Sequence, residues 1–159
     1  MQLSSLFLAA TAALLARAAP GDYRLTSKNE TLSKYSYAGV KLHDESGYVV
    51  FSDSRNMTEN AIVRLDENGD IGSKFTLRIV GPAIWALLST VVTSVEHADI
   101  TKPFAVESVD GVDNQFVYAG PGEFEWVACL VGGEYRVHLA EKSYETGCTK
   151  DIGLTAVPA

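Results

Sequence analysis

Cysteine and basic residues are scarce in this sequence, and each shortage excludes a class of protein. Two cysteines among 159 residues cannot build a scaffold of many disulfides, and they do not form the Cys-x-x-Cys pair of zinc or redox sites. The 13 basic residues are outnumbered by 20 acidic residues, which gives a formal net charge of −7. An acidic surface repels phosphate groups, so we expect neither nucleic acid nor an anionic membrane surface as a partner.

Motifs of common enzyme classes are also absent. The sequence contains no serine-hydrolase elbow, zinc-protease helix motif or phosphate-cradling glycine loop. His43, Asp44 and Glu45 lack the spacing of an established metal site, and we interpret them as a solvated turn. Residues 66–70 lack the register and the final glutamate of a calcium loop, and we interpret them as a hairpin turn. The sequence therefore predicts no metal and no cofactor.

One enzyme class stays open. A glycosidase needs only two carboxyl groups that face each other across a cleft, and 20 acidic residues cannot exclude such a pair. Trp85, Trp126 and the tyrosines could form a platform for sugar stacking, although the strand pattern predicts Trp126 to be a core residue. A small secreted, glycosidase-like hydrolase is thus the alternative function.

The chain begins with an apolar run, Leu3 to Leu15, of the length found in signal peptides. Ala16, Arg17 and Ala18 supply the small-x-small cleavage pattern. We predict that residues 1–18 are a signal peptide and that residues 19–159 form one secreted domain, of which 19–33 are a flexible N-terminal segment. Cleavage removes Arg17, so the formal net charge changes from −7 to −8. The expected location is extracellular or in a cell wall.

Two further features fit a secreted chain. Asn29-Glu30-Thr31 and Asn56-Met57-Thr58 are acceptor sequences for N-glycosylation, so we expect glycans at Asn29 and Asn56. Two cysteines in an oxidising compartment are expected to form one bridge, here between Cys129 and Cys148.

Short apolar runs separated by turn residues predict an all-β fold. Asn-Gly, Asp-Gly and Gly-Gly pairs favour tight turns because these residues tolerate left-handed backbone, and strands about ten residues apart indicate a sandwich or barrel. We predict a single antiparallel β-sandwich or barrel-like domain of about nine to ten short strands. The candidates are Tyr35–Leu42, Tyr48–Ser52, Ala61–Leu65, Lys74–Val80, Phe104–Val109, Gln115–Ala119, Phe124–Val131, Glu134–Ala140 and Ile152–Val157.

The clearest strand pair is predicted around Gly132-Gly133. In the first strand Phe124, Trp126, Ala128 and Leu130 share one face, by the two-residue period of a strand. In the second strand apolar residues alternate with Glu134, Arg136 and His138. We interpret that polar row as an outward, solvated face of an antiparallel pair, not as a catalytic site.

Residues 79–95 are the ambiguous stretch because they carry no charge. A transmembrane span here would leave both cysteines in the cytosol, where a disulfide is not favoured, so we predict no span in the mature chain. The alternatives are a short helix at Ala83–Leu88 followed by a strand at Val91–Val95, or two strands.

The closing residues carry a resemblance. Trp126-Val127-Ala128-Cys129, an aromatic-containing strand, and Gly147-Cys148-Thr149 follow a signal-bearing start with a Tyr-Arg-Leu strand at Tyr23–Leu25. This pattern resembles a family of small secreted fungal proteins of unknown function and, loosely, fungal hyphal cell-wall proteins. Relatives have more aromatic residues where this chain has Leu130 to Gly133.

The resemblance implies an all-β extracellular or cell-wall protein with no known enzyme activity, and it supplies no catalytic residues. We therefore expect a non-enzymatic binding or effector-type domain that acts outside a fungal cell. Its expected partner is a wall polysaccharide or an extracellular protein.

Overall fold

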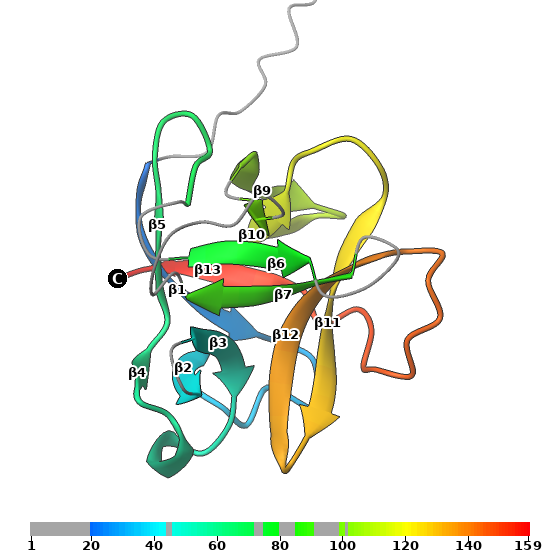
Figure 1. Cartoon of the computed structure of the whole chain (residues 1–159). Coiled ribbons are helices and arrows are strands. Elements are labelled where there is room, and N and C mark those ends of the chain that lie inside the picture. Colours follow the sequence, from blue (N-terminus) through cyan, green and yellow to red (C-terminus); the bar gives the residue numbers. More distant parts are fainter. Residues whose placement is uncertain (1–19, 44–45, 72–74, 80–84, 91–98, 101) are drawn as a thin grey trace, which may run out of the picture.

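The computed structural model describes residues 20–43, 46–71, 75–79, 85–90, 99–100 and 102–159 (Figure 1). These ranges contain thirteen strands, one short 3-10 helix (η1, Ser54–Asn56) and no α-helix. The all-β prediction is confirmed, with more strands than expected. They are β1 Gly21–Ser27, β2 Gly39–His43, β3 Ser46–Phe51, β4 Glu59–Asn60, β5 Ile62–Leu65, β6 Phe75–Ile79, β7 Trp85–Thr90, β8 Asp99–Ile100, β9 Phe104–Val109, β10 Val112–Tyr118, β11 Phe124–Val131, β12 Glu134–Glu141 and β13 Leu154–Pro158.

The strands form two antiparallel sheets that pack as a sandwich. The first sheet has the order β5-β1-β13-β10-β9, and the second has the order β4-β2-β3-β12-β7-β6-β8. In the second sheet β11 pairs with the other edge of β12, and β3 also pairs with β7. Figure 1 shows β11 and β12 as a long hairpin, after which the chain loops out before it returns as β13.

The core lies between the sheets and includes an aromatic stack. Phe104 and Phe116 stack with ring centroids 5.4 Å apart, and Phe116 and Trp126 stack at 5.6 Å. The Trp126 indole N–H donates to the Phe116 carbonyl at 2.6 Å. Trp126 is 6% exposed, so the prediction that it is a core residue is confirmed.

The prediction of a flexible segment at 19–33 is wrong for residues 21–27. These residues form β1, which pairs with β13 on one side and β5 on the other. Tyr23, Leu25 and Ser27 are buried at alternate positions, as expected of a strand with one face on the core. β1 is therefore an interior strand of the first sheet.

Residues 85–90 form β7, so the alternative of a helix at 83–88 is wrong for residues 85–88. β7 pairs with β6 on one side and with β12 on the other. The predicted strand at Val91–Val95 lies outside the described residues. The described part of the chain has no helix long and apolar enough to cross a membrane.

Residues 66–70 form a turn but not the predicted hairpin. The strand before it, β5, belongs to the first sheet, and the strand after it, β6, belongs to the second. The Asp66 carboxylate accepts the backbone N–H groups of Asp70 at 2.9 Å and Asn68 at 2.7 Å. These hydrogen bonds lower the pKa of Asp66, because they stabilise its ionised form.

Candidate functional site

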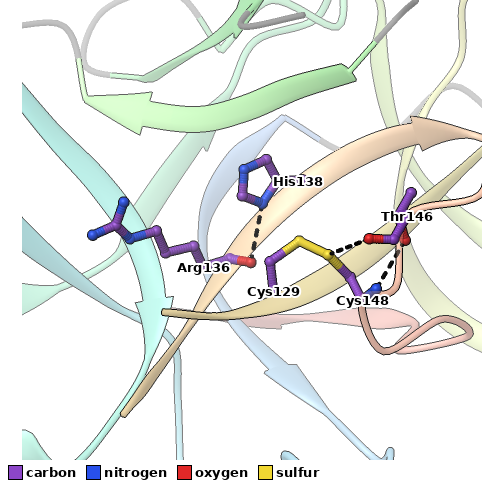
Figure 2. The surroundings of a disulfide bond; sticks show 5 residues. All are labelled: Cys129, Arg136, His138, Thr146 and Cys148. Atoms are coloured by element: carbon purple, nitrogen blue, oxygen red, sulfur yellow. Dashed lines mark hydrogen bonds between the residues drawn. A yellow bond between two sulfur atoms is a disulfide. The ribbon is translucent and has the colours of Figure 1, made fainter. Parts of the chain in front are cut away.

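The predicted disulfide joins β11 to the segment that follows β12. Ala128 and Thr149 exchange both backbone hydrogen bonds at 2.9 Å, so Cys129 and Cys148 form the next residue pair along the two segments. Residues in such a non-hydrogen-bonded pair have Cα atoms about 4.5 Å apart, and the Cα–Cα distance here is 4.6 Å. Figure 2 shows the disulfide bond between β11 and the segment that follows β12. The prediction of this disulfide is confirmed.

The disulfide packs in a small apolar cluster on the side of the β11–β12 hairpin that faces away from the main core. Val127, Cys129 and Ala140 are buried there, with Cys148 packed against them. The Cys148 N–H donates to the Thr146 hydroxyl at 3.0 Å (Figure 2). The segment after β12 is therefore held beside β11 at residues 146–149.

A groove opens next to this attachment point. Antiparallel pairing beyond Ala128–Thr149 would place Asp151 opposite Trp126, but the backbone turns away there. Asp151 and Gly153 both have left-handed backbone, with φ of 52° and 46°. The space between β11 and the diverging segment is a groove of about 330 Å³, whose lining includes Phe124, Trp126, Asp151 and Gly153.

The groove has an apolar floor and a charged rim. Phe116, Phe124 and Trp126 line it, together with the exposed valines Val109 and Val112 at the β9–β10 turn. Its charged lining residues are Asp110, Glu125, Lys142 and Asp151. Glu125 has a cation partner in Lys150, with 3.7 Å between Oε1 and Nζ. An apolar pocket with a few polar groups at its edge is the usual form of a ligand site.

No sequence pattern indicated this groove. Asp110-Gly111, one of the Asp-Gly pairs that favour tight turns, forms the turn between β9 and β10, with φ of 50° and 79°. The residues around this turn do not indicate that it comes near Asp151, which follows the β11–β12 hairpin later in the sequence. Trp126 contributes to the floor as a buried residue and not as an open stacking platform.

Two of the three polar residues in the β12 row are buried and the third, Arg136, is half-buried, so the prediction of a solvated face is wrong. Glu134 is 3% exposed and His138 is 8% exposed. Neighbouring strands supply partners for Glu134. Lys41 Nζ lies 2.8 Å from its Oε2, and the Tyr48 hydroxyl donates to its Oε1 at 3.0 Å.

Arg136 completes this buried polar cluster, which we define as Lys41, Tyr48, Glu134 and Arg136. Arg136 Nη2 donates to the Tyr48 hydroxyl at 3.1 Å, and the guanidinium carbon lies 4.2 Å from the Tyr48 ring centroid. Burial opposes ionisation of Glu134, but the hydrogen bonds from Lys41 and Tyr48 and the two cations together lower its pKa. Burial raises the pKa of Tyr48.

We expect Glu134→Ala to lower the free energy of unfolding by about 2 kcal/mol, because removing one member of a buried ion pair leaves its partners uncompensated. The loss falls below the usual range because Lys41 and Arg136 can still reach water. Denaturant unfolding measures it. Glu141→Ala, at the exposed end of β12, is the control and should change stability little. Equal losses in the two variants would contradict this account of the cluster.

His138 lies two residues after Arg136 on β12 and is paired with Leu87 of β7. Its ring Nδ1–H donates to the Arg136 carbonyl at 3.3 Å (Figure 2). Burial is the main reason that its pKa falls to about 4, and the nearby Arg136 cation adds to the effect. His138 is therefore a neutral imidazole at neutral pH.

The other predicted site residues lie apart from the groove. Asn56 is exposed in η1, and its Nδ2 lies 3.5 Å from the Ser52 hydroxyl. Asn29 is half-buried, and its Oδ1 accepts the Thr31 N–H at 2.9 Å. Asp44 and Glu45 lie outside the described residues. Among the residues that are described, no group of His, Cys, Asp and Glu could hold a metal ion.

Comparison with known proteins does not assign this chain to a family. The resemblance to small secreted fungal proteins therefore stays a prediction. No family model, no curated protein and no solved structure matches this chain.

Proposed function

We propose that this chain is a secreted, non-enzymatic β-domain that binds a wall polysaccharide or an extracellular protein outside a fungal cell, and that the groove is its binding site. The groove carries the proposal. It combines an apolar floor built by Phe116, Phe124 and Trp126 with a charged rim. Its volume of about 330 Å³ lies within the range of ligand pockets.

The disulfide supports an extracellular location, because such bonds persist in oxidising compartments. The disulfide also supports the groove as a binding site, because it holds in place a segment that contributes lining residues. The bond fixes the segment after β12 against β11 at Cys129 and Cys148. Lys142 and Asp151, which lie on that segment, both line the groove.

The binding test uses chitin, β-1,3-glucan, mannan and a displayed peptide library, each offered to the mature domain. Val112 lines the groove and Val131 does not, yet both residues are 42% exposed. Val112→Arg should abolish binding by filling the groove, whereas Val131→Arg should leave it unchanged. Binding that survives Val112→Arg would place the site elsewhere, and failure of every probe to bind would contradict the proposal.

Three carboxyl groups in the groove favour a glycosidase-like hydrolase as the alternative. Asp110, Glu125 and Asp151 all line it, and Glu125 is the best shielded, with a side chain 14% exposed. Reducing ends released from the same polysaccharides would report hydrolysis. Release that is lost in Glu125→Gln would replace the binding proposal with the hydrolytic one.

Secretion makes a separate prediction. Protein recovered from a native culture medium should begin at Ala19 and carry glycan mass at Asn29 or Asn56, because residues 1–18 have the pattern of a signal peptide and the chain carries two acceptor sequences. Mass spectrometry before and after glycan removal measures both. An intact, unglycosylated chain retained in the cytosol would contradict the proposed location.

A further inference from the structure

The groove is bordered by an unpaired strand edge. β11 pairs with β12 without interruption from Phe124 to Val131. Along such a strand the main-chain N–H and C=O groups point alternately toward and away from the partner. Ala128 uses both of its groups to bond Thr149, on the side away from β12. By alternation, the main-chain groups of Phe124 and Trp126 also point away from β12.

These main-chain groups face the groove. The segment that pairs at Thr149 would next meet Trp126 at Asp151 and Phe124 at Gly153, but it diverges through the left-handed backbone of those two residues. All four residues line the groove. In the described part of the chain, no backbone hydrogen bond joins Phe124 or Trp126 to any segment other than β12. The edge therefore offers donors and acceptors with the spacing of a strand.

The charged residues that line the groove indicate which kind of peptide segment would bind there. Asp110, Glu125 and Asp151 line it against one cation, Lys142, and Lys150 lies beside Glu125. The rim therefore carries a net negative charge, within a chain whose formal net charge is −7. A basic side chain near Asp110 and Asp151 would complement this charge.

We propose that an extended segment of a basic extracellular protein adds to β11 as a further strand at Phe124–Trp126. The inference rests on the proposed function and narrows its partner from polysaccharide or protein to a basic protein segment. In this mode main-chain hydrogen bonds supply affinity, and alternate side chains of the segment supply specificity. One side chain enters the apolar floor near Phe124, and a basic side chain lies near Asp151.

The test selects displayed random octapeptides against the mature, disulfide-bonded domain. Recovered peptides should alternate apolar and basic residues. In a synthetic copy, N-methylation of those alternate amides that face β11 should weaken binding about tenfold or more, because each lost hydrogen bond removes affinity. N-methylation of the other alternate amides should have little effect.

Protein variants test the charge. Asp151→Asn keeps a residue that tolerates left-handed backbone and should weaken binding of the selected peptide about two- to fivefold. Asp113→Asn is the control, because Asp113 is exposed on β10 and does not line the groove. Recovery of no peptides or of acidic peptides, or equal effects of both methylation patterns, would overturn the inference. If the domain then bound a polysaccharide and lost that binding in Val112→Arg, the further inference would be wrong but the proposed function would be supported. If no probe bound, both the further inference and the proposed function would be contradicted.

Discussion

Replacing either cysteine should lower the free energy of unfolding by about 3 kcal/mol. The bond between Cys129 and Cys148 closes a loop with a sequence separation of 19, and in the chain-entropy model a loop of this length restricts the unfolded chain by about that amount. Cys129→Ala, Cys148→Ala and the double variant should lose similar amounts, because each removes the same constraint. Denaturant unfolding of the four proteins measures the losses.

Comparison of the wild type with the two single variants and the double variant separates two contributions to stability, that of the crosslink and that of the packing of its two sulfur atoms. Cys129 is buried beside Val127 and Ala140, whereas Cys148 is partly exposed. If packing were the main contribution, Cys129→Ala would be much more costly than Cys148→Ala and the two losses would add. Two titratable thiols in the secreted wild-type protein, measured under denaturing and non-reducing conditions, would contradict the bond itself.

Acid should destabilise this domain through His138. Its pKa is about 4 in the folded protein against an ordinary value of 6.5, so between these values the unfolded chain binds more protons than the folded one. The stability that neutral His138 provides is complete above about pH 6.5 and is lost as the pH falls toward 4. Over this window the loss should approach about 3 kcal/mol.

The variant His138→Gln isolates this effect. Glutamine does not titrate, so the stability difference between wild type and variant should shrink by about 3 kcal/mol between pH 7 and pH 4. Glu134 and Asp66, whose pKa values are lowered, titrate in both proteins and cancel in the difference. Denaturant midpoints over a pH series give the comparison, and a difference that does not change with pH would mean that His138 does not titrate in this window.

Local patterns in the sequence were enough to place the β11–β12 hairpin. The Gly132-Gly133 turn has φ of 59° and 82°, as the Gly-Gly pair predicts, and β9 and β11 have the predicted bounds. Alternation also identified the two faces of β12 correctly. These features depend on residues close together in the chain, which is why sequence periodicity reveals them.

The errors arose where distant segments meet. Alternation shows which residues share a face, but not what covers that face. Glu134 can be buried because Lys41 and Tyr48, 93 and 86 residues away in the chain, compensate its charge. β1 was predicted only in part, as a strand at Tyr23–Leu25 within a segment expected to be flexible. Its polar residues give little sign of a strand, and its burial depends on pairing with β5 and β13.

The candidate groove could not be predicted because it is formed where a pairing ends. Residues of four strands (β9, β10, β11 and β13), of the β9–β10 turn and of the segment between β12 and β13 contribute to it, and only their arrangement in space creates the opening. Sequence did supply one essential component, the disulfide pair that fixes the segment beside β11. The left-handed backbone at Asp151, which turns the segment away, carried no sequence signal of its own.

The most direct test of the groove as the binding site is hydrogen–deuterium exchange of the mature domain, free and with saturating bound probe, either a selected octapeptide or a polysaccharide fragment. Because the amides of Phe124 and Trp126 point away from β12, ligand in the groove should slow their exchange, together with exchange around Asp151. Protection confined to β2 and β3, near the buried polar cluster, or no change in the groove with ligand bound, would contradict the account.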